Sequence, residues 1–271
     1  MKICVLNSSG NVGKSTIVKN FLYPRLSNSL IIEIETINSS NINVKNMNVI
    51  NFDLREEIEI LYMKMLENEN VIVDLGASNI SNFFEKVLDF EGFLEIFDYF
   101  VIPSVSTIKE TEDTIKTFKF LEKIGVHDKK IKIIGNKIKS DFKKEFSILF
   151  KNLDEIEERA YIKDSKLFSN LSLLKMSIED VFQNDLDFYK QKILDAETAH
   201  DKMRIIKMDM SNRMSHVIIR DFDSIFEILF NQKPFSNFSF EKDIKKEKKE
   251  AKKTEKKEEN LEENLEEAED F

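Results

Sequence analysis

Short apolar runs alternate with longer segments of helical periodicity along most of this chain. The apolar runs have the length of buried strands and fall at residues 3–6, 30–34, 49–52, 71–73, 99–102, 131–134 and 159–162. Between them, apolar residues recur every three or four positions over residues 54–68, 80–97, 108–123 and 140–150. This alternation predicts an α/β fold with a mostly parallel sheet, covered by helices on both faces.

A long helical region is expected after the sheet. From residue 184 to about 230 an apolar stripe continues without glycine or proline, which predicts one or two long helices covering a sheet edge. The methionines of this stripe also suit a subunit interface, because flexible thioethers adapt to a partner. We expect one domain over residues 1–232.

The end of the chain has a different composition. Residues 241–257 mix Lys and Glu, and the charged residues of 258–270 are all acidic. Too few large apolar groups remain for a core, so residues 241–271 are predicted to be a charged, largely disordered tail. Leu261, Leu265 and Phe271 either remain solvated or dock a partner.

The loop after the first apolar run carries the most informative motif. It reads Ser8-Ser9-Gly10-Asn11-Val12-Gly13-Lys14-Ser15-Thr16 and leads into a helical segment. A strand, such a loop and a helix predict a phosphate-binding loop (P-loop), in which backbone N–H groups and a lysine surround nucleotide phosphates. The Ser15 hydroxyl is the expected Mg²⁺ ligand. Because the strict pattern GxxxxGK[ST] has glycine where this chain has Ser8, a polar turn that merely contains Gly-Lys-Ser is the alternative.

Acidic residues stand after two further strands, where a parallel sheet places its ligands. Asp74 ends the run 71–73 and is predicted to hold Mg²⁺ opposite Ser15, the alternative being a turn cap. Glu35 follows the second run and is predicted to orient the attacking water, and Glu33 points the same way. The alternative is that both glutamates simply solvate the end of a strand.

Asn136 and Lys137 follow the sixth run, where a base-recognition pair would lie. The Asn136 amide offers both a donor and an acceptor to a purine edge. Lys139 occupies the position where a guanine reader of the type Asn-Lys-x-Asp has aspartate. The sequence therefore favours ATP over GTP.

Taken in order, these motifs resemble the ParA/MinD group of deviant Walker A ATPases, most closely the plasmid-stability proteins called StbB. The likeness runs from residue 1 to about 182. Besides the loop from Gly10 to Thr16, it rests on Glu33-Ile34-Glu35 in place of Asp-x-Asp, Asp74 at the Walker B aspartate, Val101-Ile102-Pro103, and Tyr161-Ile162-Lys163-Asp164. The resemblance implies a P-loop NTPase fold and a Mg²⁺-dependent ATPase that acts as a nucleotide switch in plasmid stability, partition or the positioning of a DNA element.

The same resemblance implies where the nucleotide and the partners bind. Ile162 and Asp164 would flank the adenine, beside Asn136 and Lys137. Lys14, Glu35 and Asp74 would be the catalytic residues. A homodimer and a protein partner, such as a DNA-binding adaptor, are also implied.

Two departures from the family pattern change the expected activity. Ser9 replaces the signature lysine, which in relatives reaches the phosphates of the dimer partner, and Asn11 replaces a glycine. Glu35 is one methylene longer than the expected aspartate. Slow hydrolysis is therefore expected, and an ATP-binding scaffold with little or no hydrolysis is the alternative. A small-molecule kinase or ligase on the same fold ranks last, because the sequence shows no acceptor pocket.

Composition narrows the list of partners. The net charge of −9 argues against a surface that coats nucleic acid, so direct DNA contact is expected to be weak or local. The basic residues of the long helical region either contact DNA or form a solvated face: Lys202, Arg204, Lys207, Arg213 and Arg220.

Cysteine content and hydropathy point to the cytoplasm. Cys4 is the only cysteine, so the chain can form neither an internal disulfide nor a Cys metal cluster. No apolar run reaches roughly 18 residues, and the acidic end differs from a basic amphipathic membrane helix. We therefore expect a cytoplasmic protein without a membrane partner.

Overall fold

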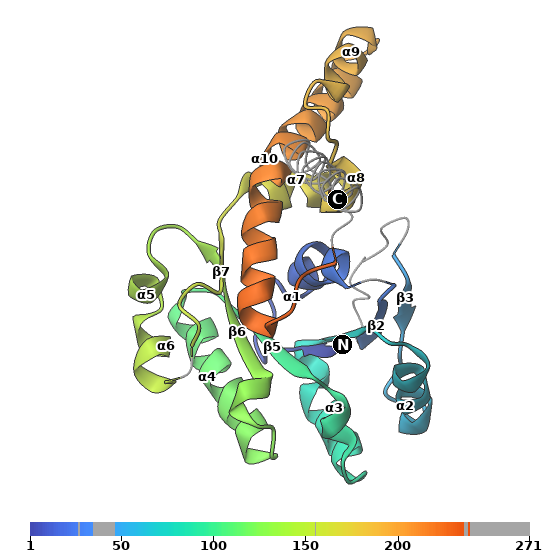
Figure 1. The fold of residues 1–271 in the computed structure, drawn as a ribbon. Helices are drawn as coiled ribbons and strands as arrows, with labels where there is room; N and C mark the ends of the chain where they lie inside the picture. Colours follow the sequence, from blue (N-terminus) through green and yellow to red (C-terminus); the bar gives the residue numbers. More distant parts are fainter. Residues whose placement is uncertain (27, 35–46, 155, 236–237, 239–271) are drawn as a thin grey trace, which may run out of the picture.

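The computed structural model describes residues 1–26, 28–34, 47–154, 156–235 and 238 (Figure 1). Glu35 and the predicted tail, residues 241–271, lie outside these residues. The sequence-based expectations for them therefore stay predictions, as does the division of the chain into a domain and a tail.

Within the described residues, one sheet of seven strands forms the centre of the molecule. The strands are β1 (Lys2–Val5), β2 (Leu30–Ile34), β3 (Val49–Asn51), β4 (Val71–Leu75), β5 (Tyr99–Ser104), β6 (Ile131–Ile138) and β7 (Tyr161–Lys163). Their order is β3-β2-β4-β1-β5-β6-β7, and every neighbouring pair is parallel. Each strand overlaps one of the predicted apolar runs. The predicted α/β class is therefore confirmed.

Helices cover both faces of this sheet (Figure 1). The α-helices are α1 (Lys14–Ile17), α2 (Ile58–Glu67), α3 (Ile80–Leu88), α4 (Ile108–Lys123), α5 (Phe142–Glu145), α6 (Ser147–Asn152), α7 (Lys166–Leu174), α8 (Ile178–Val181), α9 (Phe188–Asp195) and α10 (Ala199–Phe230). A π-helical turn, η1 (Val18–Leu22), and a 3₁₀ turn, η2 (Tyr23–Arg25), continue α1, and three further 3₁₀ turns are η3 (Ala77–Asn79), η4 (Phe93–Ile96) and η5 (Asp128–Lys130).

The alternation of side chains along the strands produces two cores. Cys4 and Leu6 belong to the core that also contains residues of α2, α3, α4 and α6. Ile3 and Val5 belong to the opposite core, which contains residues of α1, η1 and α10. The loop after β1 thus lies at the end of a central strand that is covered on both sides.

Two predicted helices are each divided in the structure. Residues 80–97 form α3, which ends at Leu88, and then η4, which begins after Gly92 in a left-handed conformation (φ 78°). Residues 140–150 form α5 and the start of α6, which meet at Phe146, whose backbone is not helical (φ −108°, ψ 30°). Periodicity alone could not show these breaks, because the apolar spacing continues across both.

The region 184–230 forms two helices, α9 and α10, as predicted. However, α10 does not cover a sheet edge: Phe222, Phe226 and Phe230 belong to the core over the central strands. The other end of α10 packs with α9 and extends away from the sheet (Figure 1). Among the described helices, none has both the length and the apolar character that a bilayer crossing requires.

An ion pair between buried Arg25 and half-buried Asp223 attaches α10 to the turn after η1. The guanidinium of Arg25 lies 2.8 Å from the Asp223 carboxylate and donates to the carbonyls of Phe21 and Ile219. Burial lowers the pKa of Arg25 to about 10, although the Asp223 charge opposes this shift. Arg25 therefore stays charged at neutral pH and needs these acceptors, which place α10 against the segment that follows the predicted P-loop.

Candidate functional site

The candidate loop leaves the carboxyl end of β1 and enters α1. Gly13, the residue before α1, has a left-handed backbone (φ 92°, ψ 28°), a conformation that glycine adopts without the penalty of a Cβ. A Cβ at this position would lie 2.3 Å from Nδ2 of Asn136. By contrast, a Cβ at Gly10 would meet no atom within 4 Å. Gly13 is thus required by the fold, whereas Gly10 leaves the outer side of the loop open.

The Lys14 side chain folds back over the loop. Its Nζ donates to the backbone carbonyl of Ser9 at 3.0 Å and to that of Asn7 at 3.3 Å, and the residue is only 5% exposed. A cation therefore stands within a turn of backbone that leads into a helix. This combination of an ammonium group and N–H groups suits an anion with several oxygens.

Asn136 holds the second half of the loop. Its Nδ2 donates to the carbonyl of Val12 at 2.9 Å, and its Oδ1 accepts from the backbone N–H of Lys137 at 2.9 Å. The residue is buried, and it reaches the loop from β6, two strands away from β1 in the sheet. The structure thus gives Asn136 a supporting role that the sequence did not suggest, and its contact with a base stays a prediction.

A pocket of about 410 Å³ opens beside this support. It is lined by Thr16, Asn136, Lys137, Lys163, Asp164, Ser165, Lys166, Phe168 and Ser169. Four residues predicted from the sequence, namely Thr16, Asn136, Lys137 and Asp164, are therefore brought together. Ile162 is not among them, because it is buried in the core and lines a neighbouring pocket next to α10.

Lys137 and two further lysines give this pocket a cationic wall. Lys137 has a left-handed backbone (φ 58°) where the pairing of β6 with β7 shifts its register, and such a bulge redirects a side chain. Lys163 and Lys166, which the sequence motifs did not indicate as site residues, line the same pocket as Asp164. The available signal was their position around the end of a late strand, since Lys163 is the last residue of β7 and Lys166 is the first of α7.

The predicted Mg²⁺ ligand Asp74 lies next to the strand that leads into the loop. In β4, Asp74 is in register with Val5 of β1 on one side and with Glu33 of β2 on the other. Both acidic residues are buried, Asp74 at 4% and Glu33 at 3% exposure. Strand alternation places both on the face that also contains α1.

The side chains around Asp74 suit Mg²⁺ that is coordinated partly by the protein and partly by a bound phosphate ligand. Burial is the main cause that raises the pKa of the Cys4 thiol, and the Asp74 charge raises it further, so Cys4 stays protonated. In the part of the chain that the structure describes, no group of three or more His, Cys, Asp or Glu residues could hold a metal ion alone. The hydroxyl of Ser15 and the carboxylate of Asp74 are oxygen donors of the kind that Mg²⁺ takes together with phosphates and water.

Comparisons with known proteins give structural similarity only. No protein-family model matches the sequence, and no curated protein matches it. The cell division ATPase MinD of Pyrococcus furiosus is 14% identical over 79% of this chain and 98% of its own, with a TM-score of 0.48.

Two further solved structures show a similar level of likeness. The MinC:MinD complex of Aquifex aeolicus is 15% identical over 79% and 96% of the two chains (TM-score 0.46). A plasmid partition protein of Borrelia burgdorferi bound to AMPPNP is 16% identical over 77% and 97% (TM-score 0.45). These neighbours are MinD and partition proteins, the group that the sequence motifs resemble. Each likeness is weak, so the functional conclusion depends on the site itself.

Proposed function

We propose that this chain binds ATP with Mg²⁺ at the loop from Gly10 to Thr16 and hydrolyses it. The observation that carries the proposal is the position of the Lys14 ammonium, held by the carbonyls of Asn7 and Ser9 inside the turn that enters α1. The adjacent strand supplies Asp74, and a pocket with three lysines continues from Thr16. The proposed metal, phosphate and base positions therefore follow one another along the carboxyl edge of the sheet, from β4 through β1 to β6, where parallel sheets bind ligands.

Each predicted residue has a role in this proposal. The backbone of Gly10, Asn11, Val12 and Gly13 surrounds the phosphates, and Lys14 neutralises their charge. Ser15 and Asp74 hold Mg²⁺, which when bound offsets negative charge on the phosphate oxygens. Thr16, Asn136, Lys137 and Asp164 form the base and ribose side, and Ile162 supports that side from the adjoining core. Glu35 is the proposed residue that orients the attacking water.

Hydrolysis is expected to be slow, because Ser9 stands where the family signature has lysine. Ser9 is 6% exposed, and its carbonyl already accepts from Lys14. A serine adds no cation for the charge that develops on the transferring phosphoryl group.

The proposed cellular role is a nucleotide switch of the ParA/MinD type, in plasmid stability or partition or in the positioning of a DNA element. The order of the motifs along the chain supports this role. The proposal includes a homodimer, a protein partner such as a DNA-binding adaptor, and at most local DNA contact through α10. A cytoplasmic location fits the single buried cysteine.

Calorimetric titration of ATP into the full chain with Mg²⁺ tests binding. Lys14→Ala should weaken ATP binding by at least about tenfold, because it removes a charge-assisted contact. Lys119→Ala, which changes an exposed lysine of α4, is the matched control and should bind like the wild type. Absence of ATP binding by the wild type, or unchanged binding by Lys14→Ala, would refute the proposal.

The alternative function is an ATP-binding scaffold without useful turnover, favoured by Ser9 in place of lysine. The rate of phosphate release, measured at saturating ATP, distinguishes the ATP hydrolase from the scaffold. Steady release that disappears in Asp74→Ala or Glu35→Ala, with ATP binding retained, would reject the scaffold. Tight binding with no release above a Lys14→Ala background would instead favour it.

A further inference from the structure

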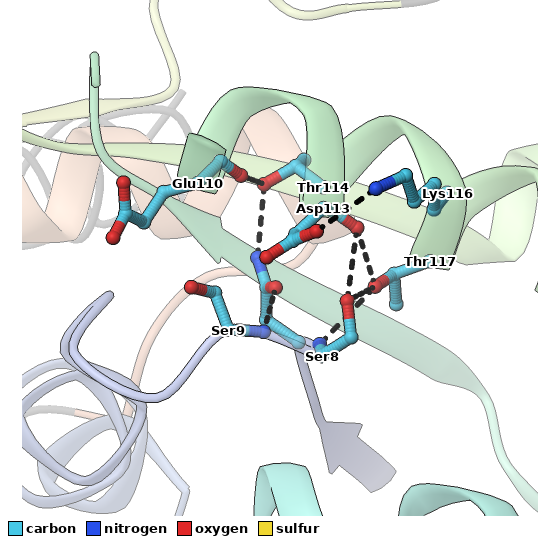
Figure 2. A network of polar contacts seen from close by, with 8 residues as sticks. Ser8, Ser9, Glu110, Asp113, Thr114, Lys116 and Thr117 are labelled. Atoms are coloured by element: carbon cyan, nitrogen blue, oxygen red, sulfur yellow. Dashed lines mark hydrogen bonds and ion pairs between the residues drawn. The ribbon is translucent and has the colours of Figure 1, made fainter. Parts of the chain in front are cut away.

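Helix α4 lies beside the first half of the P-loop and presents hydroxyl groups to it (Figure 2). Thr111, Thr114 and Thr117 recur every three residues along α4, and all three are at most 3% exposed. Threonine is a modest helix former, so a buried row of three calls for a physical reason. Their hydroxyls supply one, because two of the three contact the loop.

Thr114 accepts a hydrogen bond from Asn7, the residue that precedes the loop motif. The Asn7 Nδ2 donates to Thr114 Oγ1 at 2.9 Å and to the carbonyl of Pro103 at 2.8 Å. Thr114 Oγ1 in turn donates to the carbonyl of Glu110 at 2.8 Å and lies 2.7 Å from Ser104 Oγ. Asn7 is thus fixed from both β5 and α4.

Thr117 accepts a hydrogen bond from Ser8, the residue that departs from the strict P-loop pattern. The backbone N–H of Ser8 donates to Thr117 Oγ1 at 3.2 Å, and the two hydroxyl oxygens are 3.1 Å apart. Ser8 Oγ also donates to the carbonyl of Asp113 at 3.2 Å, which accepts from Thr117 Oγ1 at 2.7 Å. Ser8 therefore meets α4 with both its backbone and its side chain (Figure 2).

These contacts continue to the Lys14 ammonium. The side chain of Asn7 accepts from the backbone N–H of Ser9 at 2.8 Å. The carbonyls of Asn7 and Ser9 are the two acceptors that hold Lys14 Nζ. The orientation of those carbonyls depends on how Asn7 and Ser8 are held, so α4 contributes to the position of the cation although it lies outside the loop.

We propose that Ser8 and Thr117 are positioning residues that fix the loop for nucleotide binding, and that Ser8 performs this task better than the glycine of the strict pattern. The inference rests on the proposed function, because it concerns how the same loop receives the phosphates. Glycine at position 8 would lose the contacts of the Ser8 hydroxyl with the Asp113 carbonyl and the Thr117 hydroxyl. It would also allow the backbone of the unbound loop to adopt more conformations. Restoring the consensus glycine should therefore weaken binding.

ATP affinity of the full chain, measured by calorimetry with Mg²⁺, is the primary test. Ser8→Gly and Thr117→Val should each weaken binding by about three- to tenfold, because each removes hydrogen bonds of modest net strength that hold the loop. The double variant should lose less than the sum of the two single variants, because both substitutions remove the contact between the two hydroxyls. Thr117→Ser, which retains the hydroxyl, should bind like the wild type.

Thr111→Val is the matched control for a merely structural effect. Thr111 is as buried as Thr117 on the same helix, but its hydroxyl lies 3.3 Å from the carbonyl of Val105 and not at the loop. Thr111→Val should lower the melting temperature about as much as Thr117→Val and leave ATP affinity unchanged.

Kinetics give a further test of the positioning role. If turnover is measurable, Ser8→Gly should raise KM with little change in kcat.

The outcomes separate this inference from the proposed function. A wild-type chain that binds no ATP would refute the proposed function itself. A wild type that binds ATP while Ser8→Gly binds equally well or more tightly would refute only the positioning role. The role would also fall if Thr111→Val weakened affinity as much as Thr117→Val does. Should Ser8→Gly fail to fold, Ser8→Ala removes the same hydroxyl with less backbone freedom, and unchanged ATP affinity in that variant would refute the positioning role equally.

Discussion

The two halves of the predicted P-loop, counted from Asn7, which leads into it, are held in different ways. Asn7 and Ser8, in the first half, make several contacts with β5 and α4. In the second half, Val12 accepts one side-chain hydrogen bond, from Asn136, and Gly13 takes a left-handed conformation against that same amide. Among the contacts of the described residues, the first half is therefore supported redundantly, whereas the second half relies on the Asn136 side chain and on the backbone conformation of Gly13.

This difference indicates where the loop can tolerate change. When several hydrogen bonds hold the same segment, the others remain after one is removed. Single substitutions in the first half should therefore cause only partial losses of stability and ATP affinity. A left-handed glycine packed against a side chain has no substitute. Between the halves, Gly10 has free space on its outer side, which leaves room for phosphate oxygens to approach.

The largest effect is expected from Gly13→Ala. The left-handed backbone alone costs a residue with a Cβ roughly 1–2 kcal/mol, and the new methyl would collide with Asn136 Nδ2. ATP binding should be lost, and chemical denaturation should show a lower free energy of unfolding. Adding Asn136→Ala should recover part of that stability by removing the collision; an equally unstable double variant would show that the collision does not matter.

Asn136→Ala should have the next largest effect. It removes the donor to the Val12 carbonyl and the acceptor of the Lys137 N–H, and buried partners left unsatisfied cost about 1–3 kcal/mol. We expect weaker ATP binding together with lower stability, measured by calorimetry and urea unfolding. The exposed Asn152 of α6 offers a control, and Asn152→Ala should change neither measurement. Unaltered ATP affinity in Asn136→Ala would contradict its supporting role.

The sheet could be predicted from the sequence because its strands bury both faces. Runs such as Val71-Ile72-Val73 are continuously apolar, and all seven runs became strands in one parallel sheet. The carboxyl ends of those strands then placed Lys14, Asp74 and Asn136 at one edge. The pattern of apolar residues was sufficient to predict the sheet, because continuously apolar strands are typical of parallel sheets that are covered on both faces.

The supports of the loop could not be predicted, since they depend on polar contacts between distant elements. The contact of Asn136 with a base stays a prediction, but the sequence gives no sign that its amide donates to Val12, more than a hundred residues earlier in the chain. The inner face of α4 carries hydroxyls from Thr114 and Thr117, and an apolar periodicity does not mark such a face. The packing of α10 on the sheet likewise depends on Arg25, whose partner Asp223 is remote in sequence.

Thr114→Val tests whether the first half is truly redundant. The substitution keeps the shape of the side chain but removes the acceptor of Asn7 and the neighbour of Ser104. Asn7 would retain its bond to Pro103, so we expect a loss of about 1 kcal/mol in unfolding free energy and a smaller loss of ATP affinity than in Asn136→Ala. A loss of affinity equal to that of Asn136→Ala would show that both halves are equally fragile.

Gly10→Ala should have the smallest effect. A Cβ at this position meets no atom within 4 Å, and the backbone of Gly10 is not among the left-handed glycines of the described chain. The unfolding free energy should therefore change by less than about 0.5 kcal/mol, as for an ordinary surface substitution. ATP affinity is the more informative measurement, because the new methyl would point into the open space beside the loop. Unchanged stability with weaker ATP binding would place the phosphates against Gly10, whereas unchanged binding would show that they approach only the Gly13 side.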